Sequence, residues 1–424
     1  MKLAVVGGGS TYTPELADGI ARLRLPVSEL VLVDPDAHRL ELVAGLSGRI
    51  VAAYDHPAKV RGTVNLDDGL DDAGAVIVQL RIGGQAARQR DETWPLEYGC
   101  VGQETTGAGG LAKALRTVPV VLRIAERVRE RAANAWIIDF TNPVGIVTRA
   151  LLDAGHRAIG LCNVAIGFQR RFAALLGVPP ERVELGHIGL NHLSWEQSVR
   201  VDGAERLPGL LETHADEIAC EIGLPPEFVR RLGVIPSYYL RYYYAHDLVV
   251  AEQRGTPTRA EHVAAIEREL LAMYADPHLD HKPTLLGERG GAYYSEAAVA
   301  LLVSLTSLTG GHGDVQVVNV RNHGTLPFLP AGSVIEVPAR IDPLGATALS
   351  TAPVEPLFAG LIAHVSGYEE LALDAALRGG RARVVAALLA HPLIGQADAA
   401  ERLGDRLIAE NHTYLPWAAG MECR

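Results

Sequence analysis

The sequence has few cysteines and no closely spaced ones. Four occur among 424 residues, at positions 100, 162, 220 and 423, and none forms a CxxC pair. Such sparse, distant cysteines exclude the disulfide framework of a small secreted domain. We therefore expect reduced thiols and a cytoplasmic protein.

Basic residues are in deficit, and long apolar runs are missing. Lys and Arg total 39 against 50 Asp and Glu, a formal net charge of −11. Non-specific nucleic-acid binding needs a basic surface, so we expect no nucleic-acid partner. The most apolar later segment, "AAVALLVSLTSL", is too short and too polar to span a bilayer. The opening "MKLAVVGGGS" lacks the regions of a signal peptide, and we expect no membrane partner.

What the sequence does have is a regular alternation of strands and helices in its first half. Hydrophobic residues make up 48% of the chain, enough for a large core. Continuous apolar segments predict strands at 2–7, 29–34, 75–81, 135–141 and 157–163. Amphipathic segments predict helices at 13–23, 37–54, 117–134 and 143–155, and a long polar loop follows residue 81. The pattern predicts an α/β fold with a doubly wound parallel sheet.

The second half of the sequence is less regular. It contains segments of both kinds, with helices predicted at 258–276 and 381–394 and strands at 314–322 and 333–341. We therefore expect two domains. Residues 1–165 would form a Rossmann-like NAD-binding domain, and residues 166–424 a mixed α+β domain for substrate, metal and oligomer contacts.

The turn after the first strand, "VVGGGSTYTPEL", has the spacing of a dinucleotide-binding loop. Glycines let the backbone turn tightly and approach a pyrophosphate, whose charge would lie over the next helix N-terminus. Tyr12 occupies the place of the usual third glycine. Asp34 ends the second strand, where a carboxylate binds the ribose of NAD and disfavours NADP. A turn without a ligand is the alternative. The candidate cofactor-binding residues are Gly7, Gly9, Ser10, Thr11 and Asp34.

Cys162 and His192 are candidate metal ligands. Cys162 ends a predicted parallel strand, at the edge where open α/β sheets bind ligands. Asn163 and Asn191 flank the two residues with polar groups that a core would leave unpaired. Cysteine and histidine alone favour zinc. Simple burial is the alternative, because free cysteine is a common core residue.

The order of motifs along the chain resembles glycoside hydrolase family 4, the NAD- and metal-dependent glycosidases. The shared segments are, in chain order, "VVGGGSTYTPEL", "RIGGQAARQRDE", "PLEYGCVGQETTGAGG", "KALRTVPV", "DFTNPVG", "GLCNVAIG", "GLNHLSW", "IPSYYLRYYY", "GERGGAYYSEAA" and "VVNVRNHGTLPFLP". "KALRT" and Thr106 are similar to the 6-phospho-β-glucosidase branch, whereas the α-acting branch tends to have cysteine at the place of Thr106. Ala108 and Ala165 stand where the family usually has proline, which puts the local loop geometry in question and not the chemistry.

The resemblance assigns roles to several side chains. It implies that Cys162 and His192 hold Mn²⁺, with coordination positions left for substrate hydroxyls and water. Tyr239 matches the catalytic base of the family. Because Tyr238 is adjacent, the alignment does not distinguish between these two tyrosines. Core packing is the alternative for some of the tyrosines at 242–244.

The activity implied by the resemblance is hydrolysis of 6-phospho-β-glucosides to glucose 6-phosphate and an aglycone by redox elimination. NAD⁺ removes hydride from C3 of the sugar, the ketone acidifies the C2 proton, and the metal stabilises the enediolate. Tyr239 removes that proton, the C1–oxygen bond breaks, water adds at C1, and hydride returns to C3. Such a hydrolase needs a dinucleotide loop because bond cleavage depends on a transient oxidation.

A phosphorylated sugar needs cationic and polar partners. Arg88 and Arg289 match family positions near the phosphate or the sugar, and arginine can donate two hydrogen bonds to phosphate. Glu104, Asn142 and Asn163 match polar positions beside the substrate, and Glu104 could also support the metal ligands. Exposed helix and turn positions are the alternatives for the two arginines.

The sequence leaves other functions open. A relative acting on 6-phospho-α-glucosides or α-galacturonides would share the same motifs. A dehydrogenase of the lactate or malate type shares the first-half architecture but would release NADH stoichiometrically. An NAD-sensing protein would not need Cys162 and His192. We also expect a homo-oligomer, either a dimer or a tetramer.

Overall fold

Six parallel strands form one part of a large sheet. The computed structural model describes residues 1–290, 293–306 and 314–419. The parallel strands follow the order β3-β2-β1-β4-β5-β6, with bounds β1 Lys2–Val6, β2 Glu29–Val33, β3 Lys59–Thr63, β4 Ala75–Val78, β5 Trp136–Asp139 and β6 Ala158–Gly160. The strand order reverses between β1 and β4, and doubly wound sheets bind ligands in the crevice at this point. The predicted Rossmann-like sheet is confirmed.

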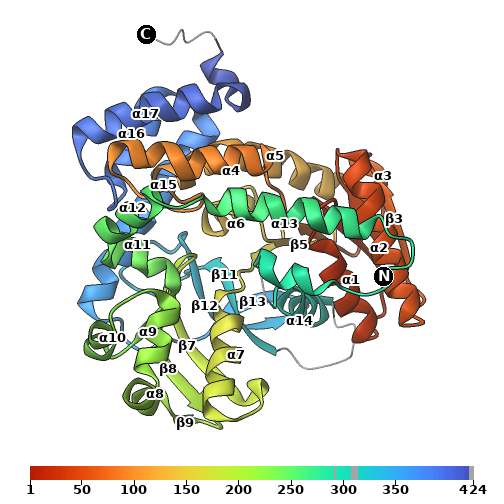
Figure 1. The fold of residues 1–424 in the computed structure, drawn as a ribbon, viewed down its shortest axis with the longest axis horizontal. Coiled ribbons are helices and arrows are strands. Elements are labelled where there is room, and N and C mark those ends of the chain that lie inside the picture. The colour runs from red at the N-terminus through yellow and green to blue at the C-terminus, as the bar shows by residue number, and fades with distance from the viewer. Residues whose placement is uncertain (291–292, 307–313, 420–424) are drawn as a thin grey trace.

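Helices cover both faces of this sheet (Figure 1). On one face α1 (Thr13–Arg22) packs against α2 (Ala37–Ala53) and α14 (Tyr294–Thr306). On the other face α5 (Gly107–Arg131) packs against α6 (Val144–Asp153) and α15 (Pro356–Arg378). The helix starts follow from sequence, since Pro14 opens α1 and Asp36 caps α2 by accepting from the Arg39 N–H at 3.0 Å.

Parts of the first half differ from the sequence prediction, which also lacks the short helix α3 (Leu66–Leu70). The prediction omits β3, which is polar and partly exposed because it lies at the sheet edge. The predicted loop after residue 81 is wrong over much of its length, because α4 (Gly84–Thr93) and the first turns of α5 occupy it. The glycines of "GAGG" resemble a helix break, but they serve close packing. A Cβ at Gly109 would lie 2.4 Å from the Gln103 carbonyl oxygen.

Three antiparallel strands from the second half extend the same sheet beyond β6. They are β11 (Asp314–Arg321), β12 (Val334–Asp342) and β13 (Gly345–Ala348), and the strands predicted at 314–322 and 333–341 are confirmed. One apolar core joins residues from β1 to the C-terminal helices. The division after residue 165 stays a prediction, and the large sheet draws strands from both sides of it.

A second, smaller sheet has the order β10-β8-β7, with β9 paired to β8. Its bounds are β7 Val183–Leu190, β8 Leu193–Val201, β9 Ala204–Glu205 and β10 Ile235–Pro236. Three helices gather around it (Figure 1), namely α8 Leu207–Thr213, α9 Ala215–Ile222 and α10 Pro226–Leu232. Because β7 packs against β12, the small sheet lies directly beside the large one.

The remaining helices surround the two sheets. Their bounds are α3 Leu66–Leu70, α7 Val164–Leu176, α11 Arg241–Tyr244, α12 His246–Arg254, α13 Arg259–Tyr274, α16 Arg381–Ala390 and α17 Ala397–Asn411. Helix α13 packs along α4, and the two lie side by side in Figure 1. Among the described helices, none combines the length and apolarity that a membrane span requires.

Candidate active site

The glycine turn lies at the carboxyl end of β1, beside β4. Gly7 has φ +87°, and a Cβ there would lie 2.5 Å from the backbone oxygen of Gln79. Only glycine suits this combination of left-handed backbone and close approach. The Gly9 N–H donates to Asp34 Oδ2 at 3.0 Å, which ties the turn to the end of β2. The structure therefore brings Gly7, Gly9 and Asp34 together in the arrangement of a dinucleotide loop.

Ser10 and Thr11 continue this turn towards α1. Ser10 Oγ accepts from the Tyr12 N–H at 3.3 Å. Thr11 is fully buried, and its hydroxyl has no hydrogen-bond partner among the described residues. These features fit a bound dinucleotide: the glycine turn leaves room for it, Asp34 presents a carboxylate at the end of β2, and the Thr11 hydroxyl lacks a partner among the described residues.

His192 lies in the tight turn between β7 and β8. Leu190 pairs with Leu193, so Asn191 and His192 form a two-residue connection. His192 has φ +63°, a conformation that non-glycine residues seldom adopt. Strained backbone of this kind clusters at functional sites, and here it sets the position from which the His192 ring projects.

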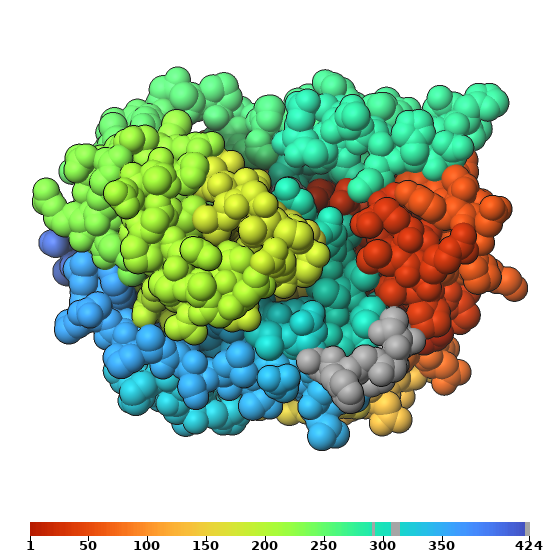
Figure 2. Space-filling view, turned by 90° about the horizontal axis from the view of Figure 1, so that it is seen from below, coloured from red at the N-terminus to blue at the C-terminus, as the bar shows by residue number. Residues whose placement is uncertain are grey.

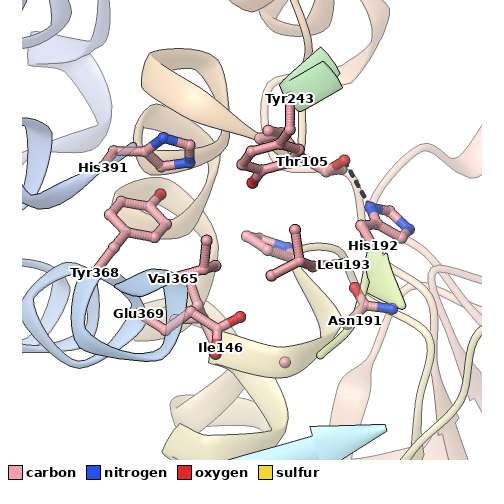
Figure 3. Close-up of a pocket in the computed structure, with 13 residues that line it drawn as sticks. Thr105, Ile146, Asn191, His192, Leu193, Tyr243, Val365, Tyr368, Glu369 and His391 are labelled. Atoms are coloured by element: carbon pink, nitrogen blue, oxygen red, sulfur yellow. Dashed lines mark hydrogen bonds between the residues drawn. The ribbon is translucent and has the colours of Figure 1, made fainter. Parts of the chain in front are cut away.

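Thr105 fixes the protonation of the His192 ring (Figure 3). Thr105 Oγ1 donates to the Gln103 side-chain oxygen at 2.8 Å, and the same oxygen accepts the Thr105 N–H. The single hydroxyl proton is thus committed, so the 2.8 Å contact between Thr105 Oγ1 and His192 Nδ1 requires a proton on Nδ1. The lone pair of Nε2 remains for a metal. Burial lowers the pKa of His192 to about 4 and keeps the ring neutral.

Tyr239 stacks on His192. The two rings are parallel within 13°, with centroids 3.6 Å apart. This contact arises because β10 adds to β8, where Pro236 pairs with Trp195. Tyr238 is 39% exposed, and the geometry therefore favours Tyr239 over Tyr238 as the base.

Cys162 lies just beyond the end of β6, beside the His192 turn. The Asn191 side chain hydrogen-bonds to its thiol, so the residue that precedes His192 contacts Cys162. Burial and the nearby charge of Glu336 raise the pKa of the Cys162 thiol to about 12. A bound cation would therefore be needed to hold it as a thiolate.

The donor set fits a metal with an open coordination shell. In the part of the chain that the structure describes, no group of three or more His, Cys, Asp or Glu side chains could hold a metal ion. A closed zinc site needs four protein ligands, whereas Cys162 and His192 supply two. The remaining positions would take substrate and water oxygens, which suit Mn²⁺. The residue types alone favour zinc, but a set of two protein ligands does not make a closed zinc site.

Glu104 lies buried among three cations. It pairs with Arg81, with Lys113 Nζ at 2.6 Å and with Arg88 Nε at 3.2 Å. Burial opposes the charge of Glu104, but the three cations together hold its pKa well below its usual range. Burial lowers the pKa of Lys113 to about 7. The structure brings the predicted residues Glu104 and Arg88 together and adds Arg81 and Lys113, which the sequence analysis missed although Lys113 lies in "KALRT".

Arg289 is held against Glu267 and Tyr12. Its Nη2 atom lies 2.9 Å from Glu267 Oε1, and its guanidinium lies 5.5 Å from the centre of the Tyr12 ring. Burial and the charges of Arg88 and Arg289 lower the pKa of Arg259, at the start of α13. Arg88 and Arg289 therefore lie near Arg259. Arg88 and Arg289 are each paired with buried carboxylates, and the three guanidinium groups form a candidate anion site.

Asn142 and Asn163 follow the neighbouring strands β5 and β6. Asn142 Oδ1 is buried and has no hydrogen-bond partner among the described residues. Asn163 is the N-cap residue of α7. Both lie at the sheet edge that carries Cys162, and the Asn142 oxygen is available for a ligand.

Two hollows adjoin this edge of the sheet. A cavity of about 20 Å³ lies beside His192, which is room for one water molecule. Figure 3 shows Tyr243, Tyr368 and Glu369 among the residues that line it. Figure 2 shows a hollow between the yellow surface of α7 and the teal surface of α14, where a groove of about 750 Å³ has Cys162 on its lining. The groove connects the Cys162 side of the site with the protein surface.

The fold and the site together define a doubly wound α/β protein with the arrangement of a dinucleotide loop and two candidate metal ligands. Residues 2–178 match the model of the family 4 glycosyl hydrolases, and residues 187–394 match the model of the family 4 glycosyl hydrolase C-terminal domain. The chain belongs to the family 4 glycosyl hydrolases.

Individual relatives agree with this assignment. The chain is 35% identical over 439 residues to a 6-phospho-beta-glucosidase of Escherichia coli (strain K12), covering 98% of this chain and 96% of the relative. The solved structure of the 6-phospho-beta glucosidase from Thermotoga maritima with NAD and glucose-6-phosphate has a TM-score of 0.91 at 34% identity, covering 98% of this chain and 99% of that one. Another structure of that enzyme, with manganese, NAD⁺ and glucose-6-phosphate, has a TM-score of 0.89 at 32% identity over the same shares.

Proposed function

We propose that the protein hydrolyses 6-phospho-β-glucosides to glucose 6-phosphate and an aglycone, by NAD-dependent redox elimination. The observation that carries the mechanism is the stack of Tyr239 on His192, which places a candidate base against a candidate metal ligand. The function agrees with the 6-phospho-beta-glucosidase names of relatives at 34–35% identity. The cofactors are NAD and Mn²⁺, as in the structures of the Thermotoga maritima enzyme.

Each cofactor has residues that would hold it. Gly7, Gly9 and Asp34 would bind NAD, and Cys162 and His192 would bind Mn²⁺. When bound, NAD⁺ supplies a reversible hydride acceptor for C3 of the sugar, and Mn²⁺ a Lewis acid for the sugar oxygens. The chain's own part is to position these groups and to move the C2 proton.

Tyr239 would take the C2 proton. Burial, with smaller contributions from Tyr238 and Cys162, raises the pKa of Tyr239 well above its usual value. A base needs the opposite shift, so Tyr239 depends on positive charge nearby. Burial opposes the charge of Arg88, but Glu104 and Glu92, and to a smaller extent the nearby Tyr239, raise the pKa of its guanidinium. Arg88 and the metal are the sources of that positive charge.

The 6-phosphate would bind at the convergent guanidinium groups. Burial lowers the pKa of Arg259, and the nearby charges of Arg88 and Arg289 lower it further. Arginine donates two hydrogen bonds to a phosphate. Asn142 and Asn163, at the strand edge, would contact the sugar. Glu104 would hold Arg88 in place through its buried ion pair.

We also propose that the enzyme is a cytoplasmic homo-oligomer, a dimer or a tetramer, and that residues 1–165 and 166–424 act as its two domains. Free thiols support the compartment, because Cys100, Cys162 and Cys220 are unpaired in the structure. Cys423 lies outside the described residues. Light scattering on the purified protein would give the oligomeric state.

One assay tests the function directly. We expect release of p-nitrophenol from p-nitrophenyl β-glucoside 6-phosphate only when NAD⁺ and Mn²⁺ are both present, and little release from the α-anomer. A phosphate bound by buried arginines contributes on the order of 2–5 kcal/mol, so cellobiose should be a far poorer substrate than its 6-phosphate. Equal kcat/KM for these two sugars would contradict the proposal. Stoichiometric release of NADH would favour a dehydrogenase.

A further inference from the structure

A buried charged triad lies beside the metal-site residues and has no part in the chemistry described above. His187 Nδ1 lies 2.6 Å from Glu196 Oε1, and His187 Nε2 lies 3.1 Å from Glu336 Oε1. All three side chains are at most 1% exposed. Both ring nitrogens face carboxylate oxygens, which only accept, so both carry protons. One imidazolium between two carboxylates leaves a net charge of −1.

The triad connects the two sheets. His187 and Glu196 are direct partners in the β7–β8 ladder, and Asn319 and Glu336 are direct partners in the β11–β12 ladder. The His187–Glu336 contact crosses from one sheet to the other. It therefore fixes the position of the His192 hairpin relative to the large sheet.

The second carboxylate oxygen of Glu336 contacts an asparagine on each of two segments that lead to the candidate metal ligands. Glu336 Oε2 accepts from Asn191 Nδ2 at 3.0 Å and from Asn319 Nδ2 at 2.8 Å. Asn191 precedes His192. Asn319 is paired in the sheet with Gly160, two residues before Cys162. A single carboxylate oxygen thus binds the hairpin that carries His192 and also β11, the strand that pairs with β6 just before Cys162.

We propose that Glu336, charged and oriented by His187, is a positioning residue that sets the distance between Cys162 and His192 and lowers the cost of placing a divalent cation there. The inference rests on the proposed metal site. Three ionised groups in a dry interior are an inefficient way to hold two sheets together, since an apolar set of similar volume often stabilises a fold as well. Net negative charge behind a cation site serves binding instead.

Manganese affinity tests the proposal without turnover. Glu336→Gln keeps an oxygen for Asn191 and Asn319 and removes the charge. We expect this variant to bind Mn²⁺ about 10–100-fold more weakly, as measured by the electron paramagnetic resonance signal of free Mn²⁺, with the Kd for NAD⁺ unchanged. Cys162→Ser should lose more affinity. Asp18→Asn is the control, because Asp18 is also a buried carboxylate, 5% exposed against 1% for Glu336, but pairs with Tyr54 and Lys282.

Asn191→Ala is measured alongside, because it removes the link and leaves the triad intact. A similar loss of Mn²⁺ affinity is expected. Because Asn191 also contacts the Cys162 thiol, Asn319→Ala, which removes the other hydrogen bond to Glu336 Oε2, decides the matter if Glu336→Gln fails to fold. The inference would be overturned if a folded Glu336→Gln variant, or the Asn191→Ala variant, bound Mn²⁺ with wild-type affinity. Unchanged Mn²⁺ binding in Cys162→Ser would also overturn it. A wild type that binds Mn²⁺ through Cys162 but hydrolyses no phosphoglucoside refutes the proposed function and leaves this inference standing.

Discussion

The ring of His192 lies flat against the ring of Tyr239, with centroids 3.6 Å apart. The candidate metal ligand and the candidate base therefore share a face rather than a hydrogen bond. Because the contact is made by the two rings, removal of the Tyr239 hydroxyl leaves the packing in place.

Tyr239→Phe should abolish most of the activity without unfolding the protein. The variant keeps the stacked ring and loses the oxygen that takes the C2 proton, and a positioned base contributes about 10²–10⁴-fold. We expect kcat to fall by that factor and the Kd for NAD⁺ to stay unchanged. Turnover of the wild type in D₂O should also place deuterium at C2 of the product, and Tyr239→Phe should suppress this exchange.

Tyr238→Phe is the matched control for this experiment. Tyr238 is 39% exposed, and its ring contacts Tyr239 rather than His192. Its hydroxyl is hydrogen-bonded to that of Tyr239, so the variant removes a neighbour of the base and keeps the base itself. Loss of the Tyr238 hydroxyl should change kcat by a small factor. If Tyr238→Phe is the variant that loses the reaction, the base has been assigned one residue too far along the chain.

Thr105→Val should weaken metal binding by removing the acceptor for His192 Nδ1. Without that hydrogen bond the ring can take the other tautomer and present a protonated nitrogen to the metal. The expected loss of Mn²⁺ affinity is about 10–100-fold. Thr105→Ser keeps the hydroxyl and should restore binding. Isothermal titration with Mn²⁺ compares the three proteins, and equal affinities for valine and serine would rule out the tautomer argument.

Asp34→Asn should relax the preference for NAD over NADP. The variant retains an oxygen for the Gly9 N–H and loses the charge that repels a 2′-phosphate. Arg39, which donates to the Gly9 carbonyl oxygen, supplies a positive charge close to this position. A hydrogen bond to a charged group contributes about 1.5–3 kcal/mol, so the Kd for NAD⁺ should rise about 10–100-fold. Fluorescence titration with both cofactors measures this. Asp36→Asn, two residues away, should keep the wild-type values.

The buried carboxyl of Asp139 should make stability depend on pH. It accepts from the Thr141 N–H at 2.9 Å and from Thr148 Oγ1 at 3.2 Å, and burial raises its pKa to about 8. The unfolded value is about 3.9, so the folded state binds one more proton between these pH values. The contribution of Asp139 to stability is full below pH about 4 and is lost as pH rises towards 8, by up to about 1.4 kcal/mol per pH unit.

Asp139→Asn removes this proton and should gain stability relative to wild type as pH rises. We expect the difference in Tm, measured by differential scanning calorimetry, to grow between pH 5 and pH 8. A constant difference across that range would mean that Asp139 titrates at its ordinary pKa in the folded protein.

The sequence by itself determined the parallel sheet and the dinucleotide loop, because both depend on local patterns. Continuous apolar strands can be recognised wherever both faces of a sheet are covered, and the turn at Gly7 needs residues that are close together in the chain. The strand β3 escaped prediction because an edge strand need not be apolar. The start of α5 escaped because its glycines serve close packing against residues 103–105.

Only the tertiary structure decided how the distant candidates combine. Cys162 follows β6 of the large sheet and His192 joins two strands of the small one, and Asn191 connects them because its side chain contacts both Cys162 and Glu336. Tyr239 joins them through the pairing of β10 with β8. Such contacts are set by the pairing of strands far apart in the chain, which hydrophobic periodicity does not encode. The sequence therefore named candidate ligands and a candidate base, and the packing of the two sheets placed the residues that contact them.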